Sequence, residues 1–169
     1  DGLDIVQGFG GGGGANYLRT LAIDEALMRT DADGSVSYLA DAIGSTVSLA
    51  DSNGTLSTEY TYAPFGETAI SGLPSPNPFQ FTGRENEGTG LYYFRARYYS
   101  ATLSRFLAED PRGLAGGTIL YTYVRNNPVN LLDPLGLQEV CPTEKDCFKV
   151  FWNCLGETVL GPGWSTVTI

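Results

Sequence analysis

The sequence predicts an all-β protein built from consecutive antiparallel hairpins. Glycine is about twice as frequent as usual, tyrosine is abundant and charged residues are few, with 22 Gly, 10 Tyr and 17% charged residues in 169. Short runs rich in β-branched and aromatic residues alternate with turn signals such as Asp-Gly and Asn-Gly. The length suits one compact domain with a core of its own.

The clearest hairpins begin at Gly34. The runs SVSYLA, STVSLA and TLSTEYTY predict three strands, and residues 34–45 align with residues 54–67 as an internal repeat. Each copy contains a glycine, an alternating strand that includes tyrosine, a turn and a second glycine. A period of about 20 residues is typical of hairpin-sized units that stack on their neighbours.

The residues before Gly34 give weaker signals. We expect a short strand over Leu3 to Val6, then a flexible connection over residues 8–14, since this glycine-rich run has few side chains to pack. Residues 17–28 (YLRTLAIDEALM) are ambiguous, because Ala, Leu, Glu and Met favour a helix while residues 20–23 suit a strand equally well.

An aromatic block follows the hairpins. Alternation along the chain would place its large rings on both faces of a strand, as in a sheet covered on each side. These rings belong to Tyr92, Tyr93, Phe94, Tyr98 and Tyr99. By the same alternation, Arg95 and Arg97 are expected on one face, two residues apart.

Residue usage changes near Leu137. Both Lys, both Trp and all three Cys follow it, and Arg is the only basic residue before it. We therefore divide the chain into residues 1–14, 15–137 and 138–169. Within the last part, PTEKDCFKVFWNCLGE predicts a short helix from an N-cap at Thr143 to a stop at Gly156. The cysteines match no zinc spacing and, being odd in number, imply no disulfide framework; they are Cys141, Cys147 and Cys154.

Composition excludes several functions. Without histidine the chain cannot form a Ser-His-Asp or Cys-His nucleophile pair or a His-containing zinc site, and we expect neither a metal nor a cofactor. A net charge of -9 argues against nucleic acid and anionic membranes as partners. No apolar run approaches the roughly 18 residues of a membrane span. Because the chain starts with Asp1 and not Met, we expect a fragment that lacks any export signal.

Two Asp-Pro pairs stand out in the second half. Asp110 precedes Pro111, and Asp133 precedes Pro134 in the run DPLGL, at the composition boundary. The simplest interpretation is structural, because aspartate before proline commonly starts a turn and its carboxylate binds nearby backbone amides.

A family resemblance adds a second interpretation. Residues 38–137 contain, in order, YLADAIGS, LADSNGT, YTYAPFGE, NPFQFTGRENEGTGLYYFRARYY, SRFLAEDPRGLAGG and LYTYVRNNPVNLLDPLGL. These segments resemble the C-terminal core of the Rhs/YD-repeat proteins, which include bacterial polymorphic toxins and insecticidal toxin-complex C subunits. The resemblance implies a YD-repeat β-ribbon wound into a hollow shell, strand and turn over residues 17–28, and an RHS repeat-associated core over residues 15–137. The family usually has Asp where Ala63 stands here.

The resemblance also implies self-cleavage. The family core is an aspartic-type autoprotease that cuts after the leucine of DPxGL and releases a toxin domain inside the shell. The matching residues are Asp110 and Asp133 as paired carboxylates and Arg97 as the nearby cation, with Leu137–Gln138 as the cleaved bond. Residues 138–169 would be the truncated start, or the stub, of the cargo. The implied partners are that cargo, upstream repeats, an immunity protein and secretion or delivery proteins, and the implied location is secreted or at the bacterial cell surface.

Paired carboxylates and a nearby arginine allow hydrolysis without histidine. Two close carboxylates can share one proton, so that one deprotonates water while the other polarises the carbonyl, with the assignment left open. Arg97 would hold one carboxylate ionised or stabilise the intermediate; alternatively it forms a buried ion pair or stacks on the neighbouring tyrosines. The other functions considered are a shell or interaction module without cleavage, and a remnant that folds poorly without its repeat neighbours.

Overall fold

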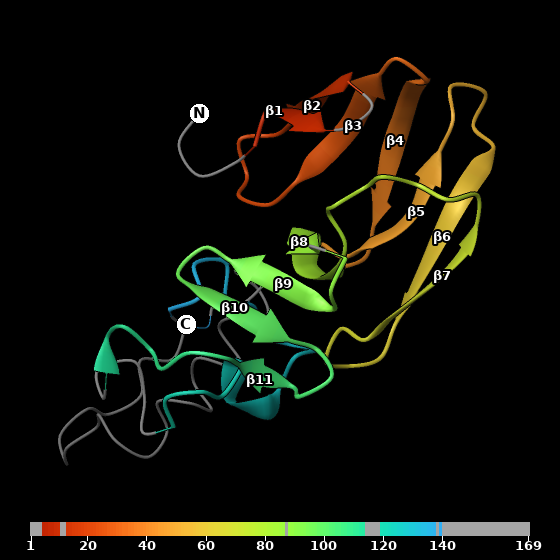
Figure 1. The fold of residues 1–169 in the computed structure, drawn as a ribbon. Helices are drawn as coiled ribbons and strands as arrows, with labels where there is room; N and C mark the ends of the chain where they lie inside the picture. The colour runs from red at the N-terminus through yellow and green to blue at the C-terminus, as the bar shows by residue number, and fades with distance from the viewer. Residues whose placement is uncertain (1–4, 11–12, 87, 114–118, 138, 140–169) are drawn as a thin grey trace, which may run out of the picture.

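A computed structural model describes residues 5–10, 13–86, 88–113, 119–137 and 139. These residues form two antiparallel β-sheets with short 3-10 turns, which confirms the predicted all-β class (Figure 1). The helix expected over residues 143–156 lies outside the described residues, as do the three cysteines.

The larger sheet is a meander of seven strands in sequence order, each antiparallel to the next (Figure 1). The strands are β1 (Gln7–Gly10), β2 (Gly13–Arg19), β3 (Ala26–Asp31), β4 (Gly34–Ala40), β5 (Thr46–Ala50), β6 (Leu56–Tyr62) and β7 (Thr68–Gly72). The hairpins predicted from Gly34 onward are β4, β5 and β6, so the period-2 pattern located them correctly.

Two successive turns of this sheet have the same hydrogen bonds. Asp41 Oδ1 accepts hydrogen bonds from the amides two and four residues later, at 3.0 and 2.8 Å. Asp51 Oδ1 does the same at 2.8 and 2.9 Å. Gly44 and Gly54 occupy the same place in the two turns with φ of +82° and +81°, a conformation that glycine adopts without steric penalty.

The N-terminal segment differs from the prediction. Of the strand predicted over Leu3 to Val6, residues 5 and 6 belong to no strand, and residues 3 and 4 lie outside the described residues. Strand β1 starts at Gln7, opposite Asn16 of β2, so part of the glycine-rich run expected to be flexible is paired in a hairpin. Glycine can form these ladder hydrogen bonds because they use only the backbone. Residues 17–28 contain the end of β2, a turn and the start of β3, as the resemblance implied and helix propensity did not.

The smaller sheet has the order β11-β10-β9-β8. Its strands are β8 (Glu85–Asn86), β9 (Leu91–Phe94), β10 (Arg97–Ser100) and β11 (Arg105–Phe106), with the 3-10 turn η1 (Phe81–Gly83) before them and η3 (Val124–Asn126) after them. One buried cluster packs on this sheet and consists of Phe81, Tyr92, Phe94, Tyr99, Ala101, Phe106, Tyr123, Val124 and Leu131.

The aromatic rings of β9 and β10 are buried on one face, not on both. Tyr92, Phe94 and Tyr99 are buried in the cluster. By contrast, Tyr93 and Tyr98 remain 38% and 39% exposed and pack against each other, with ring centroids 5.3 Å apart. The large rings thus lie on both faces of the strands, as alternation predicted, but only the rings on one face are fully buried.

Candidate functional site

The three predicted site residues meet at one buried point. Arg97, the first residue of β10, directs Nη2 toward Asp110 Oδ2 at 3.1 Å and Asp133 Oδ2 at 3.4 Å. Arg97, Asp110 and Asp133 are only 4%, 7% and 3% exposed, so the cluster is largely removed from water. Two carboxylates 23 residues apart in sequence thus share one nitrogen atom of a single guanidinium.

The remaining atoms of the Arg97 guanidinium are also engaged. Nε donates to the carbonyl of Gly136 at 2.6 Å, and Nη1 donates to the carbonyl of Leu120 at 3.1 Å. The guanidinium carbon lies 3.6 Å from the ring centroid of Phe106, so the expected aromatic stacking involves a phenylalanine and not the neighbouring tyrosines. Burial lowers the pKa of Arg97, and the charges of Asp110 and Asp133 oppose that shift. An arginine in this setting stays charged.

Each carboxylate also holds a turn. Asp110 Oδ1 accepts a hydrogen bond from the amide of Arg112 at 2.8 Å, and Asp133 Oδ1 accepts one from the amide of Leu137 at 2.9 Å. Both aspartates therefore combine the turn-initiating role with the pairing around Arg97, because Oδ1 accepts the amide of the turn and Oδ2 contacts the guanidinium. The contact to Leu137 places Asp133 against the residue that precedes the predicted cleaved bond, whereas Gln138 lies outside the described residues.

Arg95 and Arg97 do not share a face. Arg95 lies in the turn between β9 and β10, where its φ is +59°, and this turn reverses the chain between the two arginines. Arg97 reaches Asp110 and Asp133, whereas Arg95 reaches Asp24. The prediction that both arginines lie on one strand was therefore wrong, because a tight turn separates them.

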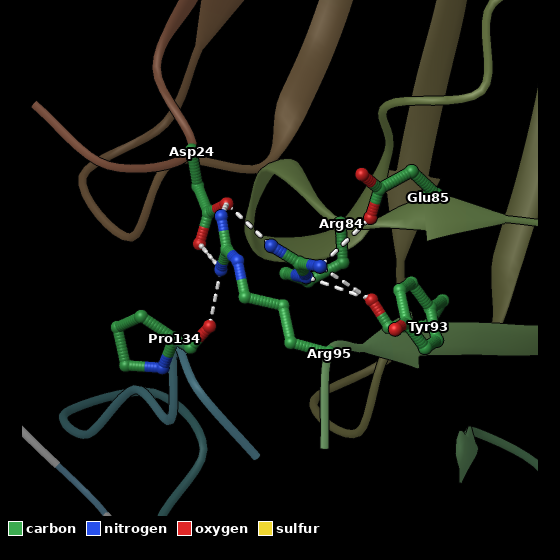
Figure 2. A network of polar contacts seen from close by, with 6 residues as sticks. All are labelled: Asp24, Arg84, Glu85, Tyr93, Arg95 and Pro134. Atoms are coloured by element: carbon green, nitrogen blue, oxygen red, sulfur yellow. Dashed lines mark hydrogen bonds and ion pairs between the residues drawn. The ribbon is translucent and has the colours of Figure 1, made fainter. Parts of the chain in front are cut away.

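A second charged network was not predicted from the sequence (Figure 2). Asp24, in the turn between β2 and β3, pairs with Arg84 and with Arg95, 60 and 71 residues further along the chain. Arg84 is anchored to the carbonyl of Tyr93 at 2.9 and 2.6 Å, and Arg95 donates to the carbonyl of Pro134. Two arginines within an aromatic block were a usable signal, but no pattern marks Asp24.

A cavity of about 270 Å³ adjoins both networks. Its lining includes Asp24, Tyr38, Ile43, Arg84, Asp133 and Pro134. It therefore extends from the larger sheet to the DPLGL segment and reaches one of the two candidate carboxylates. A space of this size can hold ordered water where polar groups line it.

The carboxylate next to Asp110 in the sequence lies outside this site. Glu109 is exposed and accepts a hydrogen bond from the hydroxyl of Tyr121 at 3.0 Å, so it contributes a charge at the surface. In the described part of the chain, no three Asp, Glu, Cys or His side chains are grouped so as to bind a metal ion. Among the same residues no helix has the length and apolarity that crossing a membrane requires.

Comparison with known proteins gives both sequence and structural relatives. Toxin subunit YenC1 of Yersinia entomophaga is 39% identical over 100 residues, 56% of this chain and 10% of YenC1. Toxin protein Tse5 of Pseudomonas aeruginosa is 36% identical over 101 residues, 59% of this chain and 8% of Tse5. The crystal structure of TcdB2-TccC3 superimposes with a TM-score of 0.65 and 31% identity, covering 81% of this chain and 7% of that one.

The chain is a relative of the Rhs-type toxin proteins. It spans about a tenth of the length of the curated relatives named above. No protein-family model matches it. The similarity to TcdB2-TccC3 identifies the two sheets as a shell-like Rhs module.

Proposed function

We propose that this chain is an Rhs shell segment that cleaves its own backbone once, between Leu137 and Gln138, by an aspartic-type mechanism. One observation carries the proposal: two buried carboxylates bind the same nitrogen of Arg97, and one of them, Asp133, also binds the amide of Leu137. Buried carboxylate pairs that share one proton are the arrangement with which aspartic proteases hydrolyse peptide bonds without histidine.

The proposed reaction is the addition of water to the carbonyl of Leu137. One carboxylate takes a proton from the water while the partner carboxyl donates its proton to the carbonyl oxygen. The first carboxyl then gives its proton to the nitrogen as the C–N bond of the tetrahedral intermediate breaks, and a hydroxyl of the intermediate returns a proton to the partner carboxylate. The products are a carboxylate at Leu137 and an amine at Gln138. Arg97 stabilises the negative charge that develops beside it. The assignment of acid and base stays open, because such a pair titrates as a unit.

The proposal extends to partners and location. The division at residues 14 and 137 would separate an N-terminal segment, the core and a C-terminal cargo of which residues 138–169 are a part. Upstream YD repeats would complete the shell, and the other partners would be an immunity protein and secretion or delivery proteins. The full-length protein would be secreted or lie at the bacterial cell surface. The toxin names of YenC1 and Tse5 support this assignment.

A second function is favoured by the turns. Asp110 and Asp133 each accept a backbone amide hydrogen bond within their own turn, which by itself is enough to explain an aspartate before proline. In that case the chain is a shell module that uses the Arg97 cluster to hold two loops together, and it cleaves nothing.

Intact mass of the freshly expressed chain at neutral pH separates the two functions. We expect the parent to be cut between Leu137 and Gln138, and Asp110→Asn to stay whole while keeping its fold, since the amide oxygen can still accept from Arg112. Neutral pH is needed because Asp-Pro bonds break in acid.

Glu109→Gln is the matched control, because it removes the adjacent, exposed carboxylate. It should be cut like the parent, as should Cys147→Ser. A parent that is folded but uncut would establish the non-cleaving module. An Asp110→Asn variant that is cut normally would overturn the aspartic mechanism.

A further inference from the structure

The turn between β9 and β10 binds the DPLGL segment through three consecutive residues. Each donates to one of three consecutive carbonyls: Arg95 Nη1 to Pro134, the Ala96 amide to Leu135 at 3.2 Å, and Arg97 Nε to Gly136 at 2.6 Å. The next carbonyl in the series is that of Leu137, where cleavage is proposed. The register of these three hydrogen bonds therefore determines which peptide bond lies beside the carboxylates.

Two of the three donors are fixed locally. The Ala96 amide belongs to the backbone of the turn, and Arg97 is held by Asp110 and Asp133. Arg95 depends on a residue of the other sheet, because Asp24 Oδ1 lies 2.7 Å from its Nη2 and Asp24 Oδ2 lies 3.1 Å from its Nη1. Such a two-point contact fixes the plane of a guanidinium as well as its position (Figure 2).

Asp24 is itself placed with little freedom. Its side chain is 10% exposed and its backbone φ is +66°, in the left-handed region. Gly83 packs against it so closely that a Cβ there would lie 2.3 Å from the Asp24 carbonyl oxygen. Arg84, the following residue, pairs with the same carboxylate. The turn between β2 and β3 is thus anchored to the smaller sheet at this point.

We infer that Asp24 is a positioning residue for cleavage: by fixing Arg95, it holds residues 134–136 in the register that presents the Leu137–Gln138 bond to the carboxylates. This role rests on the proposed function. Asp24 touches none of the reacting atoms and acts through the Pro134 carbonyl. Without the Asp24 carboxylate, Arg95 keeps its charge but loses its fixed orientation, so its hydrogen bond to the Pro134 carbonyl weakens.

Asp24→Asn tests the role in the full chain. Asparagine tolerates a left-handed backbone and has nearly the shape of aspartate, so the change removes the charge and one acceptor while preserving the turn. Asp33→Asn is the matched control, because it removes the same charge from an exposed turn of the larger sheet. We expect Asp24→Asn to slow cleavage on the order of tenfold, as losses of orienting partners typically do, and to add cuts at neighbouring bonds.

Amide exchange reports the positioning without any cleavage. In the uncut Asp110→Asn background, adding Asp24→Asn should accelerate exchange of the Ala96 amide on the order of tenfold more than it accelerates exchange of the sheet amide of Tyr99. The urea midpoint measures any loss of global stability that accompanies the removal of this buried charge. A double-mutant cycle with Arg95→Lys should show strongly non-additive cleavage rates, since both changes break one contact.

The outcomes separate this role from the proposed function. Unchanged Ala96 exchange, or faster exchange with the cleavage rate and cut position of the parent, would overturn the positioning role. Additive effects of Asp24→Asn and Arg95→Lys would also overturn it. A parent that is never cut would remove the proposed function and the catalytic consequence of Asp24 together, while the exchange experiment would still decide whether Asp24 holds the segment.

Discussion

The two sheets of this molecule are built in different ways. The larger sheet consists of consecutive hairpins, several of them with aspartate-glycine turns, and its buried hydrophobic cluster comprises only Tyr38, Leu49, Tyr60 and Phe79. The smaller sheet has strands of two to four residues around a larger aromatic cluster. Of the seven non-glycine residues described with a left-handed backbone, six lie between residues 82 and 126, in or near the smaller sheet. Irregular backbone thus concentrates where the candidate site is formed.

The contacts that hold each part differ in sequence range. Neighbouring hairpins of the larger sheet pair locally, so each strand needs only the strands before and after it. The smaller sheet depends on buried charges from distant segments, such as Arg97 with Asp133 and Arg95 with Asp24, 36 and 71 residues apart. Single substitutions should therefore damage the smaller sheet more than the larger one.

Arg97→Met should have the largest effect. Removing the guanidinium leaves two carboxylates buried without their cation, and breaking a buried ion pair in this way costs about 3–5 kcal/mol. Urea unfolding at neutral pH measures the loss. Arg105→Met serves as the control, because the exposed Arg105 only covers the ring of Tyr121 and should contribute less than about 1 kcal/mol. A loss below that value at Arg97 would show that the cluster is not a buried charge site.

The same contrast explains what the sequence could predict. The hairpins from Gly34 onward follow from alternation and turn residues, which act within a few residues of each other. The meeting of Arg97, Asp110 and Asp133 came from a family resemblance and not from periodicity, because it depends on how separate loops close over β10. Asp24 escaped prediction altogether, since its partners lie 60 and 71 residues away and no local pattern marks it.

Gly136→Ala should have the second largest effect. Gly136 has a φ of +67°, and a Cβ there would lie 2.3 Å from the carbonyl oxygen of Phe94. Gly54, in the larger sheet, has a φ of +81° but no atom within 4 Å of the same position. Gly54→Ala should therefore cost only the strain of a left-handed alanine, about 1 kcal/mol, whereas Gly136→Ala adds a backbone clash and should cost about 3 kcal/mol.

Thermal or urea unfolding of both glycine variants measures the difference. Gly136→Ala should also loosen the DPLGL segment and abolish cleavage, because the Gly136 carbonyl is the acceptor for Arg97 Nε. Equal losses in the two variants would mean that the turn at residues 133–137 is no more tightly packed than an ordinary hairpin turn, and the contrast between the two regions would fail.

Ala63→Asp should have the smallest effect, and it should stabilise the protein. The turn that starts at Ala63 has the backbone hydrogen bonds of the aspartate turns: the Ala63 amide donates to Glu67 at 2.9 Å, and the Gly66 amide donates to Ala63 at 2.8 Å. The corresponding distances in the turn of Asp51 are 2.9 and 3.0 Å. Only the side-chain acceptor is missing, so supplying it should raise the free energy of unfolding by about 1 kcal/mol.

Asp51→Ala is the reverse experiment, because it removes the side-chain acceptor from an aspartate turn. The stability that this acceptor contributes should depend on pH. The amides of Thr55 and Asn53 hold the pKa of Asp51 below its ordinary value of 3.8. A lowered pKa in the folded state means that the carboxylate contributes stability above about pH 4 and that this contribution disappears as the pH falls. Ala63→Asp should gain its stability over the same pH range. A gain that persists at pH 2 would instead come from the unfolded chain, and the three turns would then not be equivalent copies of one unit.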